Sequence, residues 1–267
     1  MLLDAAAYLP TGPLDLTEVP ADFVALSWYK ITGFPSGVGC LVARRDALAA
    51  LRRPWFAGGT VRASSAHTDW HLPAPPPEGF EDGTLPFLAL PDVTAAAAWH
   101  RALGAGAVRR HVAALTARLL AGLTTLRHPD GAPAVRVLGP LTTDGRGPTV
   151  AFNLLRPDGT PLDERLLQRA AAGARVSLRT GCFCNPGVAE EANGMTPEVV
   201  RAALLRGAPA DVDAYLAQLA VRAQGAVRAS MGVGTNTRDV DRLVEVCAEV
   251  VAKGAWEEGE FGARVGC

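Results

Sequence analysis

The segment from Asp22 to Gly39 constrains the fold most strongly. An apolar run ends at Lys30 and passes directly into a turn rich in glycine and proline. Such a run is typical of a buried strand in an α/β sheet. Among 26 basic residues, only Lys30 and Lys253 are lysines. A desolvated amine can attack an aldehyde, whereas a guanidinium stays charged and is a poor nucleophile. The alternative is a lysine that extends its charge into solvent at a strand end.

A second buried strand is expected at the N-terminus, where Asp4 stands between apolar residues. A buried aspartate is costly unless it is paired, and a protonated pyridine nitrogen is a suitable partner. A strand with Asp4, a turn-rich crossover and a strand with Lys30 can hold pyridoxal 5′-phosphate (PLP) between the two side chains. The pattern therefore predicts a PLP site at these strands.

Four segments in colinear order resemble the class-V, fold-type I PLP enzymes. They are Leu3-Asp-Ala-Ala, Ser27-Trp-Tyr-Lys30-Ile-Thr-Gly-Phe-Pro-Ser-Gly-Val-Gly39, Phe80-Glu-Asp-Gly-Thr84 and Leu178-Arg-Thr-Gly-Cys-Phe-Cys-Asn-Pro-Gly187. Within this class the chain resembles the aminotransferase-like domain of molybdenum cofactor sulfurases, which are relatives of the NifS-like cysteine desulfurases. The resemblance implies an α/β fold: a large domain with a mainly parallel sheet that lacks its N-terminal half, and a small α+β domain.

The domains are expected at residues 1–125, 126–253 and 254–267. The first is the C-terminal part of the PLP-binding large domain and ends in an interdomain helix from Asp92 to about Leu126. The second is the small domain with the cysteine loop, and the third is a flexible tail. In the small domain we expect strands at 134–138, 149–154 and 176–178 and helices beginning at Thr196 and Thr237.

The resemblance assigns cofactor roles to four residues. Asp4 keeps the pyridine ring protonated, Ser27 binds the phosphate, and Lys30 forms the Schiff base and moves protons. Thr84, which follows Gly83, reaches the phosphate of the neighbouring subunit in a homodimer. Without the resemblance, Ser27 would be a strand-end hydroxyl that bonds the backbone, and Thr84 would be a turn residue.

Cys184 is the second anchor of the resemblance, in a segment where glycine and proline favour a mobile loop. In desulfurases the corresponding cysteine attacks the sulfur of the substrate and leaves as a persulfide. The thiolate is the attacking species. A metal site formed with Cys182 is the alternative, but structural zinc sites use a wider spacing and a second pair of ligands. No metal is therefore expected.

Arg179 and Arg228 are the candidates for binding the substrate carboxylate. A guanidinium can hold a carboxylate through two parallel hydrogen bonds. Both positions match arginines of the family, one before the cysteine loop and one at the start of the last strand. Most other arginines of the chain are expected to be solvated surface charges.

The composition limits the classes of function. A chain of 267 residues with 49% hydrophobic content can form one or two domains with a sizeable core. A scattered net charge of −1 gives no basic stripe for nucleic acid, and no apolar run could span a bilayer. The N-terminus lacks the features of a secretory signal, so a cytoplasmic location is expected. The five cysteines are typical of reduced thiols rather than of a disulfide framework.

The sequence leaves three classes of function open. The resemblance implies a sulfurtransferase that moves sulfur from L-cysteine to Cys184 and on to an acceptor such as the molybdenum cofactor, releasing L-alanine. Another class-V enzyme, an aminotransferase or a lyase, is the second. An inactive fragment or binding module without cofactor is the third.

Overall fold

The chain divides into two compact units, Met1–Arg109 and Arg110–Cys267. The computed structural model describes residues 1–34, 36–254, 256 and 261–264. The division falls within helix α4 (Ala105–Thr125), and each unit is described by itself. The division into compact units does not test the expected domain limits at residues 125 and 253, so these limits stay predictions.

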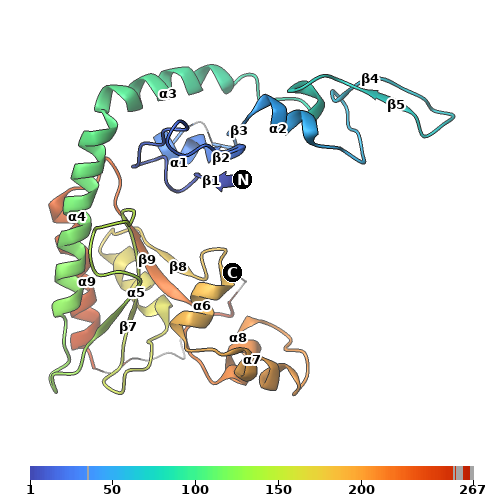
Figure 1. Cartoon of the computed structure of the whole chain (residues 1–267). Coiled ribbons are helices and arrows are strands. Elements are labelled where there is room, and N and C mark those ends of the chain that lie inside the picture. The colour runs from blue at the N-terminus through green and yellow to red at the C-terminus, as the bar shows by residue number, and fades with distance from the viewer. Residues whose placement is uncertain (35, 255, 257–260, 265–267) are drawn as a thin grey trace. The chain divides into compact units, whose positions relative to one another are not determined.

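Unit 1 consists of short strands and helices joined by long turns (Figure 1). In chain order its elements are β1 (Leu2–Asp4), β2 (Phe23–Ser27), α1 (Trp28–Thr32), β3 (Gly39–Ala43), α2 (Arg45–Ala50), β4 (Val61–Ser64), β5 (His71–Pro73), the 3₁₀ helix η1 (Glu78–Phe80) and α3 (Leu90–Leu103), which leads into α4.

The main sheet of unit 1 has the order β1-β2-β3. β1 and β2 pair in parallel, as expected, with Asp4 opposite Ala25. β3 pairs antiparallel with β2, whereas the resemblance implies a mainly parallel sheet in the large domain. The physical reason is the connection: a parallel return needs a crossover of about a dozen residues or more, and the short helix α1 with its turn folds straight back instead.

The predicted long helix from Asp92 to Leu126 is two helices. α3 ends at Leu103 and α4 begins at Ala105, because Gly104 between them adopts a left-handed φ of 78°. α3 begins at Leu90, two residues before the predicted start at Asp92, and Pro91 occupies its first turn, where proline is tolerated.

Unit 2 is a four-stranded antiparallel sheet with helices, the α+β arrangement expected for residues after α4. Its elements are β6 (Val135–Leu138), β7 (Thr149–Leu154), α5 (Glu164–Gly173), β8 (Arg179–Gly181), α6 (Pro186–Ala192), α7 (Pro197–Leu204), α8 (Val212–Leu219), β9 (Ala226–Ser230) and α9 (Thr237–Ala252).

The helix starts near Thr196 and Thr237 are confirmed, and both have caps that the sequence encodes. The Thr196 hydroxyl accepts from the Val199 amide, and Asn236 forms a capping box with Asp239. The strand expected at 176–178 is wrong by three residues, because β8 forms only where residues 179–181 meet β9.

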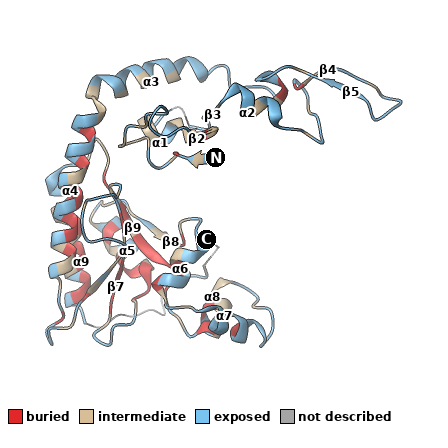
Figure 2. Cartoon of the chain, viewed as in Figure 1, coloured by how far each residue is buried: buried red, intermediate tan, exposed pale blue. Residues whose placement is uncertain are grey.

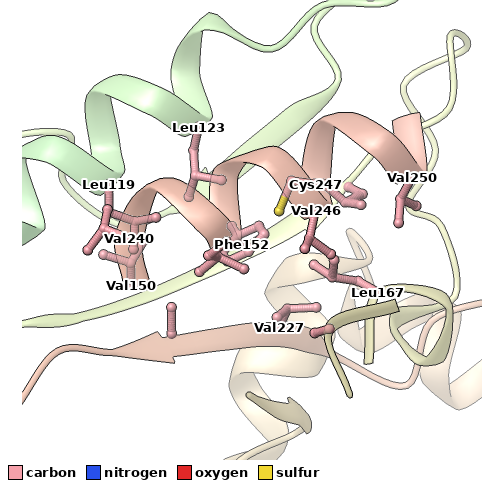
Figure 3. Packing of buried hydrophobic residues seen from close by; sticks show 14 of the residues in the cluster. Leu119, Leu123, Val150, Phe152, Leu167, Val227, Val240, Val246, Cys247 and Val250 are labelled. Atoms are coloured by element: carbon pink, nitrogen blue, oxygen red, sulfur yellow. The ribbon is translucent and has the colours of Figure 1, made fainter. Parts of the chain in front are cut away.

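The core of unit 2 lies between the sheet and α4, α5 and α9 (Figures 2 and 3). Phe152 of β7, Leu119 and Leu123 of α4 and Val246 of α9 have no measurable exposure. Figure 3 shows these side chains converging with Val227 of β9. Side chains alternate across a strand, so burial of Val227 in this core places Arg228 on the opposite face of the sheet.

The segment after α9 contacts unit 2, although a flexible tail was expected there. The Trp256 indole donates to the Val250 carbonyl at 3.0 Å, and Trp256 and Phe261 pack against the core. Phe261 also lies under the guanidinium of Arg165, 4.6 Å from its ring centre. Aromatic side chains therefore hold the described part of this segment on the surface of unit 2.

The buried side chain of Arg264 lies among the carboxylates of Asp163 and Glu164, which are buried, and of Asp213, which is partly exposed. Its guanidinium donates to Asp163 at 2.8 Å and to Asp213 at 2.6 Å, whereas its Nε lies 3.6 Å from Glu164. Burial, together with the neighbouring charge of Asp163, raises the pKa of Glu164 above its ordinary value of 4.5. Arg264 offsets this shift only in part, because its closer bonds go to the two aspartates.

We expect the Glu164→Gln substitution to change how stability depends on pH. Because the folded protein favours protonated Glu164, this side chain contributes most below pH 4.5, and the contribution is lost as the pH rises through the raised pKa. Urea unfolding of both proteins at acidic and neutral pH measures the difference. The advantage of the wild type over the variant should shrink towards neutral pH.

Glu198 offers a control of opposite sign. Hydrogen bonds from its own backbone amide and from Thr196 lower the pKa of Glu198. The advantage of the wild type over Glu198→Gln should therefore grow, not shrink, as the pH rises. A wild-type advantage over Glu164→Gln that also grows would contradict the interpretation of the buried cluster.

Candidate functional site

Three of the predicted cofactor residues lie at one edge of the β1-β2-β3 sheet. Asp4 is the last residue of β1, Ser27 is the last residue of β2, and Lys30 follows in α1. The carboxyl ends of parallel strands meet at the same edge of a sheet, which is where ligands bind in α/β folds. The pairing of β1 with β2 therefore brings together a carboxylate, a hydroxyl and an amine.

The side chains at this edge are available for a ligand. Asp4 accepts one local hydrogen bond, from the Ala6 amide at 2.9 Å, and Ser27 occupies the N-cap of α1 without making a side-chain cap. The Lys30 amine lies 6.0 Å from the ring centre of Tyr29. Within the described residues, no carboxylate forms an ion pair with Lys30.

Two expectations about this edge were wrong. Lys30 was expected at the end of a buried strand, but β2 ends at Ser27 and Lys30 is exposed in a helix of five residues that Gly33 terminates. Asp4 was expected to be buried, but it is exposed in this chain. The reason is that β1 is the edge strand of its sheet and has a neighbour on one side only.

Thr84 lies in an exposed turn after η1. Gly83, which precedes it, has a φ of 74° and donates from its amide to the Gly58 carbonyl at 3.3 Å. A side chain is disfavoured at this φ, so glycine allows the turn that presents Thr84. Its role towards a phosphate stays a prediction.

The two candidate substrate arginines lie opposite each other in unit 2. Arg179 of β8 pairs in register with Arg228 of β9, so both side chains project from the same face of the sheet. Within the described residues, no acidic side chain forms an ion pair with either of them. Two like charges directly opposite each other destabilise a sheet, and a bound anion would relieve that repulsion.

Cys184 lies on a tight turn directly after β8. The Asn185 amide donates to the Cys182 carbonyl at 2.9 Å, and the central residues Phe183 and Cys184 have φ values of 56° and 59°. Positive φ at both central positions is the pattern of a type I′ turn, which glycine and asparagine normally occupy. The turn therefore holds an exposed Cys184 in a strained backbone conformation.

Buried side chains fix the strand beside this turn. The Asn153 amide group donates to the Gly225 carbonyl at 2.8 Å, and a Glu164 oxygen accepts from the Gln224 amide at 3.1 Å. At Gly225 an added Cβ would lie 2.1 Å from the Gly181 carbonyl oxygen. Only glycine permits this close approach, which joins the start of β9 to the end of β8.

The remaining cysteines differ in accessibility. Cys40 is exposed and Cys247 is buried in the core, where burial raises the pKa of its thiol to about 12. Cys182 takes part in a disulfide bond, so the expectation of reduced thiols is wrong for this residue. Sequence spacing could not reveal the bond, because the fold decides which sulfur atoms meet.

The described part of the chain contains no group of three or more His, Cys, Asp and Glu side chains that could hold a metal ion. Nor does it contain a helix long and apolar enough to cross a membrane. The expectation that no metal is needed stays a prediction.

The residues that support the arginine pair and the turn were not predicted from the sequence. They are Phe183, whose ring lies on Arg228, and the pair Asn153 and Gly225, which fixes the start of β9. Their only signals in the sequence were a polar residue inside an apolar strand and a glycine directly before one. Neither signal shows which residue the polar side chain or the glycine contacts.

The chain is similar to known proteins over most of its length. The family model described as "Aminotransferase class-V" matches residues 1–243. Over 253 residues the chain is 36% identical to "Molybdenum cofactor sulfurase" of Bos taurus, and over 250 residues it is 35% identical to the protein of that name from Arabidopsis thaliana. These alignments cover 91% and 92% of the chain but only 28% and 30% of the relatives.

The fold is similar to that of solved cysteine desulfurases. The apo structure of the cysteine desulfurase from Thermococcus onnurineus NA1 superposes with a TM-score of 0.69 at 23% identity, covering 94% of the chain and 52% of that protein. This similarity confirms the α/β fold expected from the sequence. The chain spans about half the length of such structures and about a third of the curated relatives.

The exposed thiol on the turn and the buried thiol in the core should react differently. We expect iodoacetamide to label Cys184 in the folded protein, whereas Cys247 should be labelled only after unfolding. At pH 8 a thiol with a pKa of about 12 is ionised in roughly one molecule in ten thousand, and the thiolate is the reactive form. Peptide mass spectrometry measures both. Equal labelling of the two cysteines in the folded protein would contradict the structure.

Proposed function

Because the chain belongs to the class-V aminotransferase family, we propose that it forms part of a PLP-dependent sulfurtransferase. The enzyme takes sulfur from L-cysteine, leaving L-alanine and a persulfide on Cys184. One observation carries the proposal: Arg179 of β8 and Arg228 of β9 lie opposite each other without acidic partners among the described residues, and β8 leads into the strained turn with the exposed Cys184. This combination offers a carboxylate site beside a nucleophilic sulfur.

The residues at the edge of unit 1 fit PLP by their chemistry. The Asp4 carboxylate suits the protonated ring nitrogen, the Ser27 hydroxyl suits the phosphate, and the Lys30 amine suits the aldehyde. Thr84 would contact the phosphate held by the neighbouring subunit of a homodimer. When bound, PLP supplies the electron sink that allows charge to develop on the carbon atoms of the substrate.

The chain's own residues would divide the remaining tasks. Arg228 and Arg179 bind the carboxylate of L-cysteine and orient its sulfur. Lys30 Nζ moves a proton at the substrate Cα. The Cys184 thiolate attacks the substrate sulfur, so that a sulfur–sulfur bond forms while the carbon–sulfur bond breaks. The balance is L-cysteine plus the Cys184 thiol giving L-alanine plus the Cys184 persulfide.

We further propose that the persulfide sulfur passes to the molybdenum cofactor. The support is the name shared by the curated relatives, whose alignments cover nearly the whole chain. The proposal includes a homodimer and a cytoplasmic location.

The role of Lys30 can be tested with Lys253, the only other lysine in the sequence, as the control. The purified protein is incubated with PLP, reduced with borohydride and digested, and the modified lysine is identified by mass spectrometry. We expect the pyridoxyl group on Lys30, loss of the label in Lys30→Ala, and an unchanged result in Lys253→Ala. Labels of equal extent on Lys30 and Lys253 would contradict a specific site.

The role of Cys184 can be tested by product analysis. Cys184→Ala should lower L-alanine formation from L-cysteine by about two orders of magnitude or more, because the nucleophile is lost. It should leave pyridoxyl labelling of Lys30 unchanged. Cys40→Ala, which removes another exposed thiol, should retain the activity. Full turnover by Cys184→Ala would instead favour an aminotransferase or a lyase, and failure to bind PLP would favour a non-catalytic module.

A further inference from the structure

The side chain of Arg228 has an aromatic partner. The centre of its guanidinium lies 5.2 Å from the centre of the Phe183 ring. Its Nε is buried without a hydrogen-bond partner, and within the described residues no carboxylate pairs with it. The ring is therefore what holds the charged end of Arg228 in place among these residues. Since the guanidinium centre lies over the ring, the N–H groups at its edge can still bind a carboxylate.

Phe183 is also a central residue of the turn that carries Cys184. A positive φ is unfavourable for residues other than glycine, and here two consecutive residues, Phe183 and Cys184, adopt it. One hydrogen bond, from the Asn185 amide to the Cys182 carbonyl, closes the turn. A conformation of this kind persists only where surrounding contacts support it, and the contact of Phe183 with Arg228 is such a support.

The start of the turn cannot easily move. Gly181 is packed against Gly225, whose carbonyl is bonded to the buried Asn153. Arg228 lies three residues further along the same anchored strand. The ring of Phe183 therefore bridges a fixed point of the sheet and the part of the turn that bears the thiol.

We propose that Phe183 is a positioning residue that links Arg228 to Cys184. Its ring orients the guanidinium for a carboxylate and, through the same contact, stabilises the turn that presents the thiol. The inference deepens the proposed function, on which it rests for the identity of the carboxylate, L-cysteine. Binding of the carboxylate and the position of the sulfur nucleophile are thereby set by one aromatic side chain.

Hydrogen exchange of the Asn185 amide tests the link directly, because this amide closes the turn. In the full chain, Phe183→Leu should speed its exchange about fivefold, the factor that corresponds to loss of a cation–π contact. Leucine meets a similar penalty at positive φ, so the comparison isolates the ring. Phe183→Trp, which keeps an aromatic face for Arg228, should exchange at nearly the wild-type rate.

The contact itself is tested by a double-mutant cycle. Arg228→Gln should speed exchange of the Asn185 amide as Phe183→Leu does, and the double variant should be no faster than either single one. Phe87→Leu, the same change at an exposed phenylalanine of unit 1, is the matched control and should have no effect. The proposal would be overturned if Phe183→Leu left the exchange rate of the Asn185 amide unchanged. It would also be overturned if the double variant showed the product of the two single accelerations. Slow exchange of the β7 and β9 amides in every variant shows that the sheet remains folded.

Kinetics separate this inference from the proposed function. If the enzyme releases L-alanine from L-cysteine, Phe183→Leu should raise the KM for L-cysteine several-fold and Phe183→Trp should restore it. Equal KM values for the wild type and Phe183→Leu would overturn the carboxylate-orienting part of the proposal. If the wild-type protein releases no L-alanine, the proposed function fails, whereas the exchange experiment still decides whether Phe183 links Arg228 to the turn.

Discussion

The arrangement of the candidate site residues in unit 2 depends on the contact between the main chains of Gly181 and Gly225. It brings the end of β8 against the start of β9 more closely than any side chain would allow. This contact sets the register of β8 and β9, in which Arg179 lies opposite Arg228 and the turn with Cys184 follows β8. A side chain at Gly225 would separate the strands and disperse the arginine pair.

Buried polar groups reinforce that constraint from the core side. Asn153 bonds the carbonyl of Gly225, while Glu164 bonds the amide of Gln224, so consecutive residues before β9 are held by side chains from two other segments. Buried polar groups are costly unless they are hydrogen-bonded, so these two bonds favour one arrangement of the backbone, although Asn153 Oδ1 is itself buried without a partner among the described residues. Arg264 belongs to the same network through Glu164, which connects the segment after α9 to the support of β9.

Unit 1 shows how much a site depends on what surrounds it. Its sheet brings Asp4 and Ser27 to one edge and Lys30 close behind, yet Asp4 and Lys30 are exposed. The chain spans about a third of the curated relatives, and the strands of this sheet expose apolar side chains such as Leu2, Leu41 and Val42. The sequence therefore nominated three chemical groups that the fold brings to one edge of the sheet, whereas their exposure could not be inferred from the apolar residues beside them.

Local signals in the sequence determined the elements with strong patterns. The caps at Thr196 and Asn236 start α7 and α9, and the apolar run at 149–154 forms β7, because capping and periodicity act within a few residues. The segments that carry the family resemblance were equally readable, since they are short and colinear. These segments contain every nominated site residue except Arg228.

Only the tertiary structure decided which residues meet. The break at Gly104, the return of β3 and the position of β8 depend on a backbone conformation or on a pairing partner distant in the chain. The same holds for the ring of Phe183 on Arg228 and for the burial of Glu164 beside Arg264. Such contacts join segments that are separated by tens of residues, and their energies exist only once the chain has folded.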